Sequence, residues 1–169
     1  MKPTQVLMVC LGNICRSPTA QGVLEDRVRR LGLERYILVD SAGTSGWHIG
    51  ELPDARSRKA ALRRGYDLSQ QRGRQVTVTD FHDFDYVLAM DGQNLQALKA
   101  LCPDGFAGHL GLLLEFSQKQ TYLEVPDPYH GGSDGFELVL DLIEEAADGL
   151  LTDILEKRPE IRALAKSAT

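Results

Sequence analysis

The fold follows from residues 6–18, which read Val6-Leu7-Met8-Val9-Cys10-Leu11-Gly12-Asn13-Ile14-Cys15-Arg16-Ser17-Pro18. Val6 to Val9 is a continuous apolar, partly β-branched run, which is typical of a strand buried on both faces. After a short loop, Ser17 fits the N-cap of a helix and Pro18 its first turn. We expect this helix to run to about Leu31 and to end at Gly32.

The same alternation of strand and helix continues along the chain. Further strands are expected at 36–39 and 86–89, and a fourth at 110–114, where the short apolar run is also compatible with a helix. Helices are expected from Pro53 to about Arg64, closed by Gly65, after the cap Asp91, and over 136–157, before Pro159. This order implies right-handed crossovers and a parallel sheet with both faces covered, which is an α/β fold.

Length and charge limit the classes of protein to which the chain can belong. With 169 residues and 43% apolar residues it suits one domain over 1–169, with about the last ten residues a candidate loose tail. The net charge of -5 argues against a general nucleic-acid binder. The richest basic stretch is expected to be a solvated face rather than a docking patch, and comprises Arg56, Arg58, Lys59, Arg63, Arg64, Arg72 and Arg74.

Cysteine usage and hydropathy predict a soluble protein of the cytoplasm. The chain has three cysteines, an odd number that does not make a disulfide framework and that indicates a reducing compartment. The apolar run near the start breaks at Gly12-Asn13 without a small-residue cleavage site, so a signal peptide is not expected. The later apolar stretch 138–155 carries five acidic residues, which excludes a membrane span and hence a membrane partner.

Cys10 and Arg16 enclose five residues at the carboxyl end of the first strand, where parallel sheets bind ligands. A loop of this length can direct successive backbone N–H groups inward as a nest for an anion, and the adjacent helix terminus favours negative charge there. Gly12 and Asn13 are residue types that tolerate a positive φ. Arg16 can donate two parallel hydrogen bonds to phosphate oxygens. Cys10 in such a positive field is expected to be a thiolate, which a hydrogen bond from the Ser17 hydroxyl can stabilise.

The whole string from Cys10 to Pro18 resembles the active-site loop of the low-molecular-weight protein tyrosine phosphatases. Three further segments are similar to that family in the same order, namely 40–44, Asp-Ser-Ala-Gly-Thr, 84–91, Phe-Asp-Tyr-Val-Leu-Ala-Met-Asp, and 125–129, Val-Pro-Asp-Pro-Tyr. The resemblance implies a three-layer α/β/α fold with a central four-stranded parallel sheet and a phosphate-binding loop between the first strand and the first helix.

The resemblance also implies a mechanism for hydrolysing phosphotyrosine. Cys10 attacks phosphorus and forms a phosphocysteine, Arg16 and the loop hold the oxygens, and Asp127, restricted by Pro128, acts first as acid and then as base. Trp47 and Tyr129 form a slot for the phenyl ring, Ser41 supports the loop, and a disulfide with Cys15 can shield the nucleophile. The remaining substrate-binding residues are Leu11, Gly12, Asn13, Ile14, Cys15 and Ser17.

These site assignments compete with plainer interpretations. Taken alone, Asp127 is compatible with a turn residue, Trp47 with a half-buried loop aromatic, and Cys15 with a small residue facing the core instead of a redox role. Members from eukaryotes often carry a second aromatic residue where His130 stands here, and a solvent-exposed histidine is expected. The resemblance implies phosphotyrosine proteins as partners, inorganic phosphate as product, no cofactor or metal, and a monomer.

Rival functions remain open on the same fold. Protein-arginine phosphatases usually carry threonine where Ile14 stands, which favours tyrosine here. Arsenate reductases of this lineage use two further cysteines, but only Cys102 lies outside the loop. A non-catalytic phosphate-binding module is a rival of another class, against which the intact set Cys10, Arg16 and Asp127 argues. The four histidines show no paired spacing for zinc.

Overall fold

A computed structural model describes residues 1–167 and places four parallel strands at the centre of the chain, in the order β2-β1-β3-β4. In this sheet β1 is flanked on one side by β2 and on the other by β3, so that Val9 is paired with both Ala42 and Ala89. The strands are β1 (Thr4–Cys10), β2 (Ile37–Gly43), β3 (Tyr86–Ala89) and β4 (His109–Leu112). The expected α/β fold with a four-stranded parallel sheet is confirmed.

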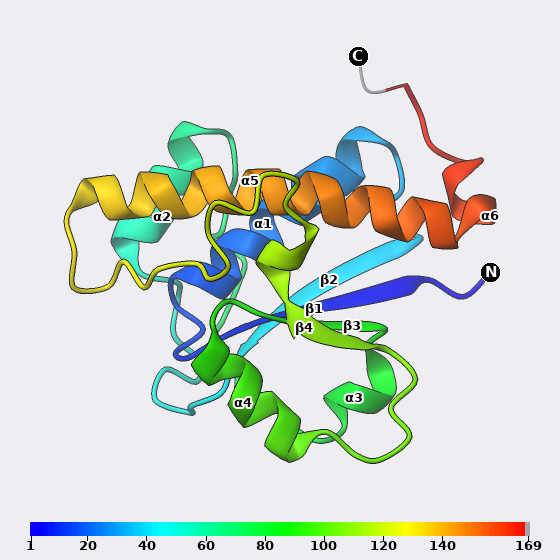
Figure 1. Cartoon of the computed structure of the whole chain (residues 1–169). Helices are drawn as coiled ribbons and strands as arrows, with labels where there is room; N and C mark the ends of the chain where they lie inside the picture. Colours follow the sequence, from blue (N-terminus) through cyan, green and yellow to red (C-terminus); the bar gives the residue numbers. More distant parts are fainter. Residues whose placement is uncertain (168–169) are drawn as a thin grey trace.

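Helices cover both faces of the sheet and make a three-layer arrangement (Figure 1). One face is covered by α1 (Arg16–Arg30), α2 (Ala55–Arg63), α5 (Ser133–Lys157) and the short α6 (Pro159–Arg162). The other face carries α3 (Asp80–Asp83) and α4 (Gly92–Leu101). No helix within residues 1–167 is long and apolar enough to cross a membrane.

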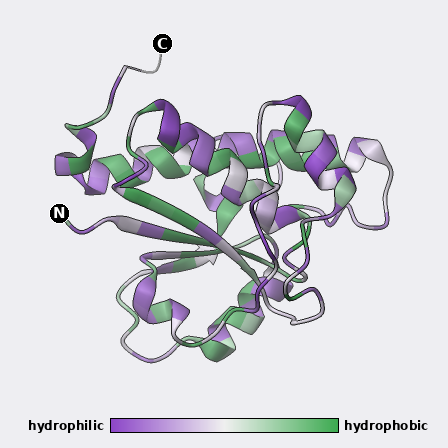
Figure 2. Cartoon of the chain, turned by 180° about the vertical axis from the view of Figure 1, so that it is seen from behind, coloured by the Kyte–Doolittle hydropathy of each residue, from purple (hydrophilic) through white to green (hydrophobic). Residues whose placement is uncertain are grey.

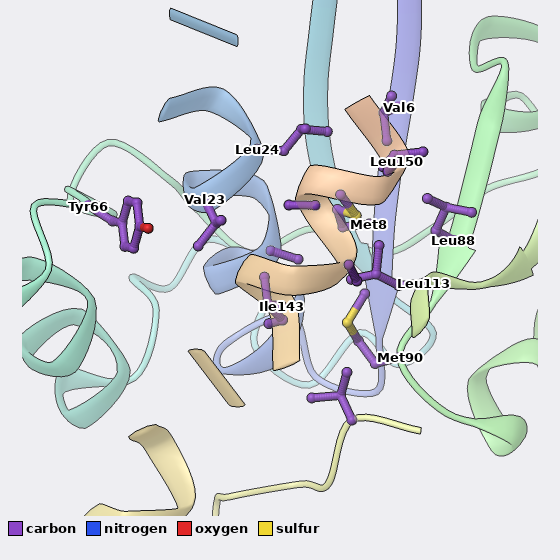
Figure 3. Close-up of a cluster of buried hydrophobic side chains, with 14 of the residues drawn as sticks. Val6, Met8, Val23, Leu24, Tyr66, Leu88, Met90, Leu113, Ile143 and Leu150 are labelled. Carbon is purple, nitrogen blue, oxygen red and sulfur yellow. The ribbon is translucent and has the colours of Figure 1, made fainter. Parts of the chain in front are cut away.

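The side chains of β1 divide between two hydrophobic cores because successive residues of a strand point to opposite faces. Val6 and Met8 lie in the larger core with α1 and α5 (Figure 3), whereas Leu7 and Val9 lie in the smaller core with α3 and α4. All four are fully buried. Figure 2 shows hydrophobic stretches in the strands, which lie between two layers of helices of mixed hydropathy. The prediction of a strand buried on both faces is therefore confirmed.

Of the two polar residues predicted to cap helices, one does so and the other does not. Ser17 does not cap α1, because the helix already begins at Arg16, and its buried hydroxyl is hydrogen-bonded inside the protein instead. Asp91 does cap α4, where its carboxylate accepts the N–H of Asn94 at 2.8 Å. Gly32 and Gly65 follow α1 and α2 with φ of 69° and 91°, the left-handed conformation in which helices commonly end.

The apolar run 110–114 contributes to both of the structures left open for it. β4 ends at Leu112, and the 3-10 helix η1 (Leu113–Phe116) follows directly. Beyond Pro159, Ile161 of α6 is fully buried, and the N–H of Lys166 donates to Leu31 O at 2.7 Å. Residues 168–169 of the expected tail lie outside the described residues.

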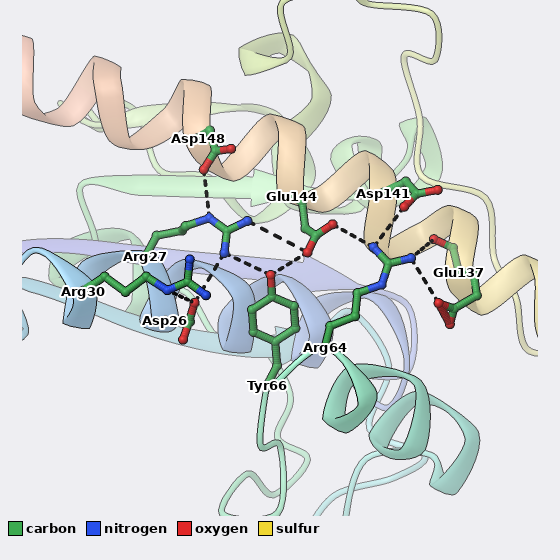
Figure 4. Close-up of polar contacts among 9 residues, drawn as sticks. All are labelled: Asp26, Arg27, Arg30, Arg64, Tyr66, Glu137, Asp141, Glu144 and Asp148. Atoms are coloured by element: carbon green, nitrogen blue, oxygen red, sulfur yellow. Dashed lines mark hydrogen bonds and ion pairs between the residues drawn. The ribbon is translucent and has the colours of Figure 1, made fainter. Parts of the chain in front are cut away.

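A polar network joins α1 and the end of α2 to α5 (Figure 4). Arg27 of α1 donates to Asp148 at 2.9 Å and to the Tyr66 hydroxyl at 2.9 Å, and that hydroxyl donates to Glu144. Arg64 pairs with three acidic residues of α5 at 2.7–3.0 Å, Glu137, Asp141 and Glu144. This member of the basic stretch is therefore an internal partner of α5 and not part of a solvated face.

Candidate active site

Cys10 is the last residue of β1, and its side chain lies at the carboxyl end of the sheet, only 3% exposed. The chain crosses from β1 to β2 on one side and reaches β3 on the other, so the strand order reverses at this point. Ligands of open α/β sheets bind in the crevice at such a reversal. The backbone topology alone therefore places the sulfur at the position where a ligand is expected.

The loop after Cys10 turns its carbonyl groups outward. Three of them accept N–H bonds at 2.7–2.9 Å, Cys10 O from Thr44, Leu11 O from Ser45 and Ile14 O from Asp54. Of the N–H groups of residues 11–15, that of Asn13 donates to Cys10 Sγ at 3.3 Å, and no other has an acceptor within residues 1–167. Backbone N–H groups left without acceptors next to the sulfur are suitable donors for an anion.

Asn13 organises the polar groups behind the loop. Its Oδ1 accepts the backbone N–H of Arg74 at 3.0 Å, which fixes the orientation of the side-chain amide. Its Nδ2 donates to Ser17 Oγ at 2.8 Å and to Ser41 Oγ at 3.0 Å. Ser17 Oγ also lies 3.0 Å from Cys10 Sγ and 3.5 Å from the carbonyl oxygen of Ala42, so its single hydrogen can be donated to either of these acceptors.

The expected positive φ is found at Asn13, with a value of 57°, and not at Gly12. Gly12 serves instead to leave space, since a Cβ at this position would lie 3.2 Å from Cδ2 of the His48 ring. Sequence reasoning missed His48, which lines the site and is hydrogen-bonded to Glu51. Its position directly after Trp47 is the only signal in the sequence that could have suggested it.

The guanidinium of Arg16 is fixed through one of its nitrogens, Nη1. Its buried Nη1 donates to Asp91 at 2.7 Å and to the carbonyl oxygen of Val125 at 2.9 Å. Its Nη2 lies 3.8 Å from Asp127 Oδ2, and both residues line one pocket. Sequence reasoning took Asp91 only as a helix cap, although an acidic residue at the carboxyl end of a neighbouring parallel strand was a usable signal.

Asp127 and Tyr129 lie on the segment that follows Val125 and also line this pocket. Asp127 Oδ1 accepts the backbone N–H of Tyr129 at 3.1 Å, and the carboxylate is about half exposed. The Tyr129 ring lies against the Arg56 guanidinium, 5.3 Å from ring centre to Cζ, and edge-on to His130 at 4.9 Å. His130 is exposed, as expected. Trp47, expected to be half-buried if it had no role, is 74% exposed.

These side chains enclose a pocket of about 180 Å³. Cys10, Arg16 and Asp127, which the sequence analysis proposed as catalytic, all line it. The other lining residues are Leu11, Gly12, Ile14, Cys15, Trp47, His48, Tyr129 and His130. Asn13, Ser17 and Ser41 lie behind the loop and reach the pocket only through hydrogen bonds.

Cys15 is a second sulfur in the same pocket, and it is 4% exposed. Burial raises the pKa of its thiol to about 12, a shift that a hydrogen bond with Ser57 only partly offsets. Cys15 is therefore a neutral thiol at neutral pH, which argues against it as the group that attacks phosphorus. Cys102, at the end of α4, is partly buried and does not line the pocket.

Comparisons with known proteins give a consistent result. Residues 5–160 match the family model described as low molecular weight phosphotyrosine protein phosphatase. A low molecular weight protein-tyrosine-phosphatase of Bacillus subtilis is 39% identical over 153 residues, which cover 90% of this chain and 97% of the relative.

Two solved structures show how closely the fold is shared. A protein tyrosine phosphatase from Entamoeba histolytica superposes with a TM-score of 0.88 at 38% identity, covering 92% of this chain and 99% of the other. The Drosophila arginine phosphatase superposes with a TM-score of 0.81 at 33% identity, covering 91% and 98% of the two chains.

Proposed function

Because this chain belongs to the low molecular weight phosphotyrosine protein phosphatase family, we propose that Cys10, Arg16 and Asp127 carry out its hydrolysis of phosphotyrosine. The chain is a protein-tyrosine phosphatase, and its substrates are phosphoproteins. The observation that carries the residue assignment is the sulfur of Cys10 at the base of a nest of N–H groups, in one pocket with Arg16 and Asp127.

In the first step the Cys10 thiolate attacks phosphorus. An S–P bond forms and the P–O bond to the phenol oxygen breaks. The loop N–H groups and Arg16 Nη2 stabilise the equatorial oxygens of the phosphoryl group. Asp127 donates its proton to the departing phenolate, which leaves as a neutral tyrosine side chain. The fixed edge of Arg16, bonded to Asp91 and Val125, supports this role because it holds the free edge in place before the substrate arrives.

In the second step Asp127, now ionised, takes a proton from water. The oxygen of that water attacks phosphorus, the S–P bond breaks, and inorganic phosphate leaves as the product. The Cys10 thiolate is regenerated, and the hydroxyl of Ser17 at 3.0 Å stabilises the charge that returns to the sulfur. Acid–base assistance of this kind contributes about 10²- to 10⁴-fold.

Trp47 and Tyr129 bind the phenyl ring of the substrate between them. Both line the pocket and both are exposed enough to be covered by an arriving ring, with exposures of 74% and 40%. Phosphotyrosine-containing proteins are thus the substrates, and residues 1–169 act as one monomeric domain. The three free cysteines support a reducing cytoplasm as the compartment.

Arginine phosphorylation is the second candidate chemistry, since the Drosophila arginine phosphatase has the same fold. Ile14 lines the pocket at the position where a threonine hydroxyl is usual in such enzymes. An isoleucine cannot donate a hydrogen bond to a P–N substrate. Phosphotyrosine is therefore the preferred substrate.

The experiment compares phosphate release from a phosphotyrosyl peptide, a phosphoseryl peptide and a phosphoarginyl peptide of the same sequence. We expect turnover of the phosphotyrosyl peptide to dominate and to disappear in Cys10→Ser. Faster turnover of the phosphoarginyl peptide would overturn the substrate assignment, and activity retained in Cys10→Ser would overturn the nucleophile.

A further inference from the structure

The basic stretch between Arg56 and Arg74 separates in the structure into neutralised and unneutralised side chains. Arg64 is paired with acidic residues of α5 (Figure 4), Arg74 with Asp40 and Asp80, and Arg56 with Asp54. The four others have no ion-pair partner within residues 1–167, namely Arg58, Lys59, Arg63 and Arg72.

Two of these unneutralised cations lie on one face of α2. Lys59 and Arg63 are four residues apart, and Arg56 precedes Lys59 by three, so all three project from the same side of the helix. Both Lys59 and Arg63 are exposed. Like charges at this spacing repel each other by a few tenths of a kcal/mol, which an anion between them would relieve.

This face of α2 lines a second cavity, of about 270 Å³, against the start of α5. Arg56, Lys59 and Arg63 form one wall, and Gly132, Ser133 and Phe136 form the other. The first turn of α5 has no side-chain cap, so its N–H groups add positive partial charge. Glu137 also lines the cavity, but its Oε1 is paired with Arg64 at 3.0 Å. Asp134 does not line it.

The second cavity lies next to the catalytic pocket, and the stacked side chains of Arg56 and Tyr129 stand between the two. The Arg56 guanidinium lies between the rings of Tyr129 and Phe136, with Cζ 5.3 Å and 4.9 Å from the two ring centres. Tyr129 lines the catalytic pocket and Arg56 lines the second cavity, so the pair forms a wall between them. Asp54 fixes Arg56 through two bonds of 3.0–3.1 Å and joins it to the Ile14 carbonyl of the catalytic loop.

We propose that this second cavity binds an anionic side chain, a carboxylate or a further phosphoryl group, of the same protein whose phosphotyrosine occupies the catalytic pocket. This inference rests on the proposed function. An extended substrate segment advances about 3.3 Å per residue, so an acidic side chain a few residues from the phosphotyrosine reaches the adjoining cavity. The substrates favoured by this enzyme are therefore phosphotyrosine segments with acidic or multiply phosphorylated flanks.

The test uses three sets of phosphotyrosyl peptides with one scaffold sequence. One set has neutral flanks, one has a glutamate moved through positions one to five on either side, and one has a second phosphotyrosine at the same positions. We expect kcat/KM for the best anionic peptides to exceed that of the neutral peptide by about three- to tenfold, the size that two exposed ion pairs supply. The advantage should shrink as salt is raised.

The decisive variant is Lys59→Gln/Arg63→Gln, which should remove the advantage while leaving turnover of p-nitrophenyl phosphate unchanged. The matched control is Arg35→Gln/Lys99→Gln, which removes the same charges from exposed sites that line neither cavity. The control should keep the advantage. An equal loss in both variants would mean a general charge effect and would overturn the inference.

The two proposals fail in different ways. If the wild-type enzyme hydrolyses all the peptides with equal kcat/KM, the second site is wrong and the catalytic assignment stands. If no aryl phosphate is hydrolysed, the proposed function is wrong. In that case, fluorescence anisotropy with the labelled peptides decides the second site, which is overturned if the anionic peptides bind no more tightly than the neutral one.

Discussion

Asp91 Oδ2 accepts a hydrogen bond from Arg16 Nη1 at 2.7 Å, although 75 residues separate them in the chain. The same carboxylate caps α4 through its other oxygen, which accepts the N–H of Asn94 at 2.8 Å. One side chain thus fixes both the start of a helix and the guanidinium of Arg16. The end of β3 is thereby coupled to the loop that follows β1.

Replacing Asp91 by Asn should weaken phosphate binding without unfolding α4. Asparagine is as good an N-cap as aspartate, so the cap is kept while Arg16 Nη1 loses the carboxylate to which it donates. We expect kcat/KM for an aryl phosphate to fall by about tenfold, or about 1.4 kcal/mol, within the range for hydrogen bonds to charged groups. Steady-state kinetics with a melting curve measures both effects. Unchanged kinetics would show that Val125 alone positions Arg16.

Replacing Cys10 by Ser should abolish turnover and leave the fold intact. The hydroxyl is of similar size and can still accept the Asn13 N–H, but it is not ionised at neutral pH. Activity on p-nitrophenyl phosphate should fall to background while the melting temperature stays close to that of the wild type. Residual turnover well above background would identify a different nucleophile.

Replacing Asp127 by Asn should slow the reaction according to the leaving group. Phenyl phosphate and phosphotyrosine need a proton on the departing oxygen, so kcat should fall by about 10²- to 10⁴-fold. Substrates with strongly acidic phenols leave without that proton and should lose far less in the first step. Burst kinetics across a series of aryl phosphates provides the comparison. Equal losses along the series would remove Asp127 from the acid role.

Replacing Cys15 by Ser should make oxidative inactivation irreversible. Peroxide oxidises the Cys10 thiolate to a sulfenic acid, and the neutral Cys15 thiol then condenses with it, forming the S–S bond and releasing water. The wild type should therefore recover activity in dithiothreitol, whereas the variant should proceed to sulfinic and sulfonic acid, detectable by mass spectrometry. Cys102→Ser is the control and should recover like the wild type. Full recovery of Cys15→Ser would exclude the disulfide.

Replacing Asp54 by Asn should cost stability in a pH-dependent manner. Burial would raise the pKa of the Asp54 carboxyl, but hydrogen bonds from the Arg56 side chain and from the N–H groups of Arg56 and Ser57 outweigh it, so the pKa is lowered. The stabilisation is fully present above the ordinary value of about 3.9 and is lost as pH falls through the lowered value.

Melting curves of wild type and Asp54→Asn from pH 3 to pH 7 test this dependence. The difference in melting temperature should be largest near neutrality and should narrow below about pH 4. Asparagine retains the side-chain acceptor for the N-cap of α2, so the difference reports the charge. A constant difference across the whole range would show that the charge of Asp54 contributes nothing.

Sequence patterns predicted the backbone around the site well because those patterns act over short distances. The apolar run of β1, the positive φ of Asn13 and the cap at Asp91 each depend on the residue itself and its neighbours along the chain. A residue's local preference did not decide its role where its side chain hydrogen-bonds to buried groups. Ser17 is a good cap by propensity, yet its hydroxyl is bonded to Cys10 and Asn13.

The sequence by itself determined that Cys10 and Arg16 enclose a loop of five residues at the end of a buried strand. Only the tertiary structure decided which charges are free to act. Arg64, which directly follows α2, is neutralised by α5, whereas Lys59 within α2 is not, and Arg16 is paired with Asp91. Charge pairing depends on which helix packs against which, and that packing joins residues far apart along the chain.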